Sequence, residues 1–228
     1  MRRPVGWLLF LVAIIVSAVL VAPYLSLDSA GSRLEVSAGL HYFVLVAHVF
    51  TAAVALVAGP LQFLARVRAR RPVHRLIGRI YLFAGVLPAA VTAVPVAWWS
   101  GRVVTQIGLT TAAVLWLITG GLAYRAARRG DFAGHREWMM RNYALTFLAV
   151  TSRALVPLLL LAQVPFTDGD VGSIGRQAAA MIPIGQTAGW IINLLVVESL
   201  LRRSRRRARP VTETRAVRPA GRRSRPAG

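Results

Sequence analysis

The sequence predicts an all-α protein, a polytopic transmembrane bundle of six helices. Three observations predict it. Hydrophobic residues make up 56% of the 228 residues, they gather in six long runs, and arginines gather in alternate connections between those runs. A helix needs about 20 mostly apolar residues to cross a bilayer, because unpaired backbone groups cannot lie in lipid. This apolar content exceeds what a soluble domain of similar length uses.

The six apolar runs are the predicted spans. They cover residues 5–22, 40–64, 76–99, 104–124, 143–161 and 178–200. The first run follows Arg2 and Arg3 and has the charge and length of a signal peptide. A cleaved signal ends in small residues at positions −3 and −1, whereas here Leu20 and Ala22 would occupy them, with Pro23 after the cut. We therefore interpret the first run as an uncleaved signal anchor.

The charges predict the orientation of the spans. All 28 basic residues are arginine, against eight acids, for a formal net charge of +20. Arginines cluster in residues 2–3, 66–79, 125–141 and 202–228, which fall on one side of a six-span chain. The positive-inside rule makes that side cytoplasmic, so the sequence predicts a multi-pass protein of a bacterial-type plasma membrane with both termini inside. Because the arginines lie between apolar runs, no specific nucleic acid is expected as a partner.

This reading divides the chain into four parts. Residues 1–38 hold the anchor helix and an outer loop, and residues 39–163 form a four-helix membrane core with two His-Arg cytoplasmic loops. Residues 164–201 hold a second outer loop and the sixth helix. Residues 202–228 form an Arg-rich tail with almost no large apolar residue, which predicts a disordered segment attracted to anionic lipid headgroups.

An internal repeat accounts for the core. At a constant offset of 61 residues the chain repeats Gly59 as Gly120, Leu61 as Leu122, Arg68 as Arg129, His74 as His135 and Arg75 as Arg136. The offset predicts two duplicated helical hairpins, so that helices 2–5 form the four-helix core. Both hairpins run in the same direction and would be parallel repeats about an axis along the membrane normal.

The repeated His-Arg pairs are the leading candidates for a site. His74 and His135 both enter helices from the cytoplasmic side, and neutral imidazole can ligate a metal or haem iron. The cofactor-binding candidates are His74, His135, Arg75, Arg136, Arg79 and Arg141. Asp131 and Glu137 could orient an imidazole or complete a metal site with the two histidines. The alternative is that each histidine is an interfacial residue bonded to lipid phosphate or backbone.

Two motifs also carry a family resemblance. They are His74-Arg-x-x-Gly78-Arg79-x-Tyr81 and Gly130-Asp131-x-x-x-His135-Arg136-x-Trp138-Met139-x-Arg141-Asn142-Tyr143-Ala144. With His48 and Gly59-Pro-x-Gln62-Phe63, they resemble bacterial membrane proteins catalogued as domain of unknown function 2306, over roughly residues 40–160. The resemblance implies a multi-helix membrane protein without an established activity, substrate or cofactor, and leaves the first and sixth helices outside.

A second candidate site lies within the predicted membrane-spanning region. His48 and Arg153 lie within predicted spans, where ionisable groups are costly and usually face a bundle interior or a wet cavity. We expect them to share a polar interior with Asn193. Only one histidine lies deep in the predicted bundle, so a buried haem between two histidines is disfavoured, while a haem held at the cytoplasmic surface by His74 and His135 is not.

Three functions remain open from the sequence. The first is a membrane protein that binds a cofactor or ligand, such as haem, a quinone or a metal, with electron transfer as one use. The second is a small-molecule transporter or exporter, and the third is a non-catalytic assembly or scaffold protein. Cysteine is absent, which excludes disulfides and thiolate chemistry. The sequence leaves open whether the chain is an enzyme or a homo-oligomer.

Overall fold

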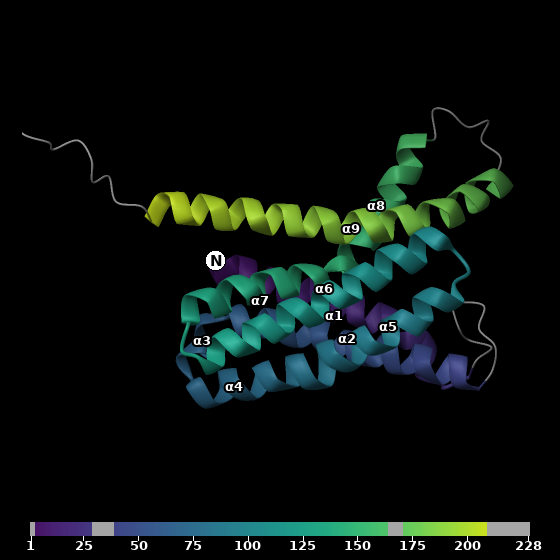
Figure 1. Ribbon diagram of the computed structural model, residues 1–228. Coiled ribbons are helices and arrows are strands. Elements are labelled where there is room, and N and C mark those ends of the chain that lie inside the picture. The colour runs from purple at the N-terminus through teal and green to yellow at the C-terminus, as the bar shows by residue number, and fades with distance from the viewer. Residues whose placement is uncertain (1–2, 29–38, 164–170, 209–228) are drawn as a thin grey trace, which may run out of the picture.

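The computed structural model describes residues 3–28, 39–163 and 171–208, and every regular element in these ranges is helical (Figure 1). The elements are α1 (Arg3–Val21), the short turn η1 (Ala22–Tyr24), α2 (Leu40–Phe63), α3 (Ala65–Ala69), α4 (Arg71–Arg79), the π-helical segment η3 (Ile80–Val86), α5 (Leu87–Trp99), α6 (Val103–Arg128), α7 (Phe132–Thr146), α8 (Leu148–Gln163) and α9 (Val171–Ala208). The predicted all-α class is confirmed.

Length and hydropathy identify the membrane spans. Within the described ranges, five continuous helical stretches are long and apolar enough to cross a membrane: Val5–Tyr24, Leu40–Phe63, Arg71–Trp99, Val103–Arg128 and Ala180–Arg207. The sixth candidate is the pair α7 and α8, which bends by 45° at its break. A continuous fifth helix over residues 143–161 was therefore the wrong prediction, because a helix already begins at Phe132 and the break follows Thr146.

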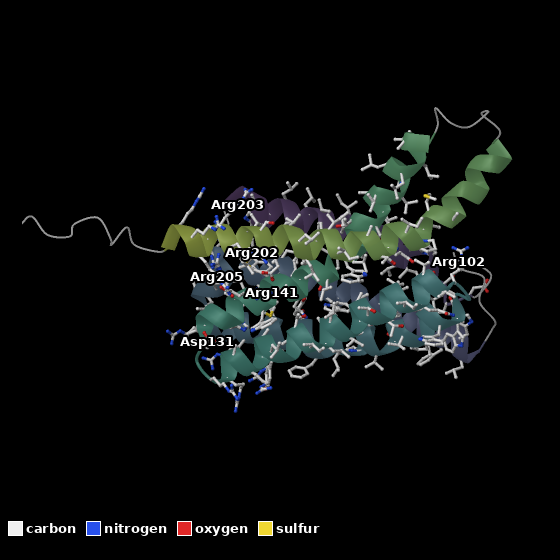
Figure 2. The ribbon with its side chains drawn as sticks, turned by 45° about the horizontal axis from the view of Figure 1, so that its top comes forward. Arg102, Asp131, Arg141, Arg202, Arg203 and Arg205 are labelled. Atoms are coloured by element: carbon white, nitrogen blue, oxygen red, sulfur yellow. The ribbon has the colours of Figure 1, made fainter. Side chains whose placement is uncertain are left out.

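The helices pack mainly on their neighbours in the chain. Helix α1 contacts α2, α2 contacts η3 and α5, and α5 contacts α6. Helix α9 lies along α6, α7 and α8, while α8 rises away from the bundle (Figure 1). The start of α1 and the end of α9 lie at the same end of the molecule as α3. Figure 2 labels Arg202, Arg203 and Arg205 at this end and Arg102 at the other. We call the former the Arg-rich end.

Glycines let helices approach one another in the core. A side chain at Gly59 would collide with the Tyr143 ring, and one at Gly120 would lie 3.3 Å from the Leu82 side chain. The predicted offset of 61 residues relates these two contacts, because Gly59 corresponds to Gly120 and Leu82 corresponds to Tyr143. The first hairpin supplies the glycine in one contact, and the second hairpin supplies it in the other. Reciprocal contacts of this kind fit parallel hairpin repeats, and the duplication itself stays a prediction.

Candidate functional site

A cavity of about 720 Å³ opens at the Arg-rich end, between the two predicted helical hairpins. Its walls come from the end of α2, from α4 and η3, from the end of α6 and from the first part of α7. The residues lining it are Gln62, Arg71, His74, Arg75, Gly78, Arg79, Leu82, Phe83, Tyr124, Ala127, Arg128, Phe132, His135 and Met139. We call this cavity the His–Arg pocket. The described residues that line it include four arginines and two histidines but no Asp or Glu.

The two histidines predicted to form a site lie together in this pocket. The ring centroids of His74 and His135 are 6.4 Å apart, and the ring planes are nearly perpendicular at 88°. Each histidine is the fourth residue of its helix, α4 or α7. The equivalent register of the two helices therefore brings the rings to a common place.

Hydrogen bonds to α2 and α6 hold the two histidine positions. Gln62 Nε2 donates to the His74 carbonyl over 3.3 Å, and His135 Nδ1 lies 2.9 Å from the Ala123 carbonyl. A carbonyl only accepts, so His135 Nδ1 is the donor in this contact, and in the neutral tautomer the lone pair lies on Nε2. His74 Nδ1 is buried and has no hydrogen-bond partner among the described residues. The pocket thus contains an imidazole nitrogen that the described part of the chain leaves without a partner.

The arginines of the pocket differ from the predicted set. Arg75 and Arg79 line it as expected, whereas Arg136 and Arg141 are not part of its lining. Arg71 and Arg128 line it but were not predicted as site residues. The signal for Arg71 was present in the sequence, since residues 71, 75 and 79 recur every fourth position and so follow one face of a helix.

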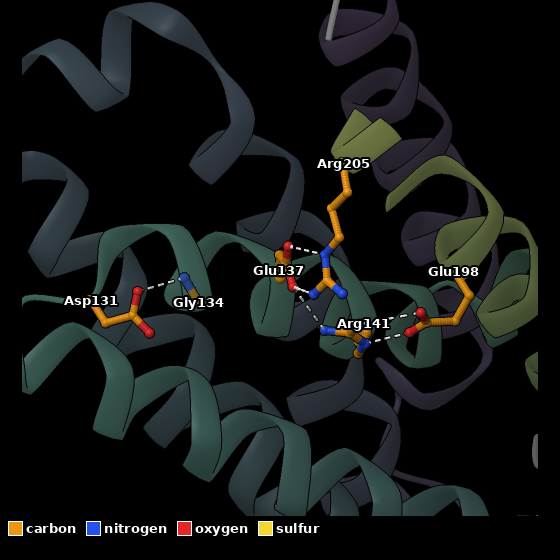
Figure 3. Close-up of polar contacts among 6 residues, drawn as sticks. All are labelled: Asp131, Gly134, Glu137, Arg141, Glu198 and Arg205. Atoms are coloured by element: carbon orange, nitrogen blue, oxygen red, sulfur yellow. Dashed lines mark hydrogen bonds and ion pairs between the residues drawn. The ribbon is translucent and has the colours of Figure 1, made fainter. Parts of the chain in front are cut away.

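The acidic metal candidates are engaged elsewhere. Asp131 caps α7, accepting a hydrogen bond from the Gly134 backbone N–H over 2.8 Å (Figure 3). Glu137 pairs with Arg205 of α9 and lies 3.8 Å from an Arg141 nitrogen. Among the described residues no three His, Cys, Asp or Glu side chains form a group able to hold a metal ion. Neither acid lines the pocket with the histidines.

Arg141 joins α7 to α9 instead of facing the pocket. Its Nε donates to Glu198 Oε1 over 2.5 Å and a terminal nitrogen to Oε2 over 3.2 Å (Figure 3). The guanidinium also stacks on Trp138, 4.7 Å from the ring centroid. Helix α7 therefore has one face toward the pocket, with His135, and another that binds α9 through charges.

The three predicted intramembrane polar residues are not brought to one site. His48 Nδ1 lies 2.9 Å from the Ala89 carbonyl, on α5. Asn193 accepts a hydrogen bond from Thr151 and donates to the Ala144 carbonyl. Arg153 is exposed on α8 and donates to the carbonyl of Ala149 over 2.7 Å. The expectation that Arg153 faces a polar bundle interior with His48 was therefore wrong.

Sequence reasoning missed a polar network at the centre of the bundle. Tyr81 donates to Asn142 Oδ1 over 2.6 Å, and Asn142 Nδ2 donates to the Trp116 carbonyl and to Thr119. Tyr81 and Asn142 are fully buried. Thr146 bonds to the Tyr81 hydroxyl and accepts from the Trp116 indole, over 2.8 and 3.0 Å. We call Tyr81, Trp116, Thr119, Asn142 and Thr146 the central network.

These features define a polytopic helical membrane protein with a charged pocket at one end. The family model described as "Predicted membrane protein (DUF2306)" matches residues 45–201, and the chain belongs to this family. The predicted resemblance is confirmed, but it extends through most of α9, which was expected to lie outside. No curated protein and no solved structure matches the chain. The family description gives a membrane location and no activity.

Proposed function

We propose that this protein binds an amphiphilic anion in the His–Arg pocket. The observation that supports the proposal is the lining of the cavity, which combines four arginines and two histidines with an apolar wall. Its volume of about 720 Å³ is in the range of small-molecule sites, about 300–1,000 Å³. The protein is thus a ligand-binding membrane protein, and electron transfer is one use that such a ligand would allow.

The positive charge of the pocket favours an anionic ligand. Arg71, Arg75, Arg79 and Arg128 line it, and the described lining residues include no acid to neutralise them. A guanidinium presents five N–H donors in a planar fork that matches carboxylate and phosphate oxygens. A bare metal cation would be repelled by these side chains, and a neutral quinone would leave the guanidinium groups without an anionic partner.

The apolar wall of the pocket favours a ligand that also has a hydrophobic part. Phe83 and Tyr124 meet edge to face with ring centroids 5.6 Å apart, and both side chains are more than 40% exposed. Phe132, also exposed, and Leu82 continue this wall. An amphiphile can extend its charged group toward the arginines and its apolar part along these exposed rings.

We also propose that the pocket faces the cytoplasm of a plasma membrane, following the positive-inside rule. A reporter active only in the cytoplasm should therefore be active when fused after Arg209 and inactive when inserted at Asp168. A periplasmic reporter should give the reverse pattern. Activity of the cytoplasmic reporter at Asp168 would contradict this orientation.

Ligand binding can be tested by stabilisation of the purified full chain in a neutral detergent. The probe is dioctanoyl phosphatidate, and dioctanoylglycerol is the uncharged match. A ligand at 100 times its Kd stabilises the folded state by about 2.7 kcal/mol, so phosphatidate should raise the thermal midpoint by several degrees while dioctanoylglycerol leaves it unchanged. Equal shifts from both compounds would contradict an anion site.

Two arginine variants locate the effect. Arg75→Gln and Arg79→Gln should each weaken phosphatidate binding at least about tenfold, since hydrogen bonds to charged groups contribute about 1.5–3 kcal/mol. Arg203→Gln, on α9 outside the pocket lining, is the matched control and should bind as the unaltered protein does. Equal weakening in the control would indicate nonspecific attraction to charge, and the proposal would fail.

A further inference from the structure

The separation of the two pocket histidines fits two ligands that share one metal ion. A metal–nitrogen bond of about 2.0–2.1 Å on each side, plus the radii of the two rings, puts opposed imidazole centroids about 6 Å apart. The observed separation of His74 and His135 is 6.4 Å. A bent anion oxygen accepting about 2.8 Å hydrogen bonds from both rings would hold the centroids at about 6.5–7 Å. The separation therefore fits one bridging atom, and the other groups of the pocket decide which atom it is.

The hydrogen bonding of the imidazoles is also that of metal ligands. A ligating histidine usually donates its other ring N–H to a carbonyl or carboxylate, which fixes the tautomer. His135 makes this contact through Nδ1 to the Ala123 carbonyl, 2.9 Å away, so in the neutral ring Nε2 is the nitrogen that can ligate a metal. His74 contributes a buried Nδ1 without a partner in the described chain. Each ring thus has a nitrogen without a hydrogen-bond partner among the described residues.

A bare metal ion does not suit this pair. Structural zinc takes four protein ligands, and catalytic zinc three. The described residues contain no third His, Cys, Asp or Glu grouped with the two histidines, and Asp131 and Glu137 are held in other contacts. Arginines around the pair would further repel a free dication. Only a metal that brings its own equatorial ligands and its own negative charge needs no more than two histidines here.

We infer that the anion of the proposed function is haem, with His74 and His135 as its two axial ligands. The inference rests on that proposed function, because it names the ligand of the same pocket. A haem supplies four equatorial nitrogens, two carboxylates for guanidinium groups such as those of Arg75 and Arg79, and a flat apolar body for the wall at Leu82 and Phe83. These are the three kinds of group that line the pocket.

The test is a titration of the purified full chain with haemin, followed by absorption spectra before and after reduction. The expected result is saturation at one haem per chain, with the spectrum of a six-coordinate, low-spin iron. His74→Ala and His135→Ala should each lose the six-coordinate spectrum, and added imidazole should restore it by filling the vacated position. His41→Ala, whose ring lies 4.4 Å from Trp99 at the opposite end, is the matched control and should give the unaltered spectrum.

The outcomes separate the two proposals. Absence of saturable haemin binding, or a six-coordinate spectrum that survives in both alanine variants, overturns the haem inference and leaves the rings as an edge-to-face contact, which has a similar separation. Should a variant fold poorly, His74→Met and His135→Met keep a side chain able to ligate iron, and an altered six-coordinate spectrum in them supports the inference. Stabilisation by phosphatidate without haemin binding removes haem alone, whereas stabilisation by neither probe removes both proposals.

Discussion

The central network and the His–Arg pocket are both rich in polar side chains, yet they are built in opposite ways. In the network, the Asn142 amide and the Tyr81 hydroxyl find partners within the chain at 2.6–2.8 Å. In the pocket, like charges face one cavity and His74 Nδ1 is buried without a described partner. Satisfied polar groups stabilise a bundle, whereas unsatisfied ones cost stability and are retained where a ligand completes them.

The largest predicted effect tests the network side of this comparison. Asn142→Leu removes three hydrogen bonds, those of the amide with the Tyr81 hydroxyl, the Trp116 carbonyl and Thr119. We expect the free energy of unfolding to fall by about 2–4 kcal/mol, since each lost hydrogen bond costs about 0.5–1.5 kcal/mol. The measurement is unfolding of the purified protein in mixed micelles with increasing denaturing detergent.

The matched control for this variant is Tyr81→Phe. It keeps the ring that fills the core and removes two hydrogen bonds instead of three, so the loss should be smaller, about 1–2 kcal/mol. A stability of Asn142→Leu equal to that of the unaltered chain would mean that the network adds nothing to stability, and the comparison with the pocket would lose its basis.

The sequence predicted the fold where hydropathy decides it. Long apolar runs were enough to predict the membrane-spanning helices, because lipid excludes unpaired backbone whatever the details of packing. The break after Thr146 was not predictable in this way, since residues 143–150 contain no Pro or Gly. Thr146 is held by Tyr81 and Trp116, from two other elements. A local pattern does not report such tertiary contacts.

The site was predictable to the extent that helical periodicity determines it. His74 and His135 occupy the same register in repeated segments, and they do lie together. Arg141 comes six residues after His135, about one and two-thirds helical turns, and so leaves on another side of α7, toward Glu198. Asp131 was one candidate to orient an imidazole or complete a metal site, although an Asp three residues before a backbone N–H at a helix start is a typical cap.

A smaller effect of opposite sign is expected in the pocket. Without ligand, Arg75→Gln combined with Arg79→Gln should raise the thermal midpoint by about 1–2 °C, because the change relieves repulsion among arginines with no acid in the described lining. Stabilising changes at binding sites commonly cost function. The measurement is a thermal unfolding curve in ligand-free detergent, with Arg203→Gln as control. A clear loss of stability would show that these arginines act as structural residues and would erase the contrast with the network.

The smallest effect concerns the charges between α7 and α9, which belong to neither region. Arg141 and Glu198 form a two-pronged pair whose side chains are 15% and 36% exposed, whereas Arg205, the partner of Glu137, is 62% exposed. Exposed ion pairs contribute little because solvent screens them and long side chains lose freedom. A double-mutant cycle of Arg141→Gln and Glu198→Gln should give a coupling of about 1 kcal/mol or less. The cycle of Glu137→Gln and Arg205→Gln should give a smaller coupling, and added salt should reduce both.

Because His135 lies on the pocket side of α7, the substitutions of neither cycle should change haemin or phosphatidate binding. A change in ligand affinity with these variants would mean that the α9 contacts set the position of His135, so that the pocket and the charged face of α7 act as one unit.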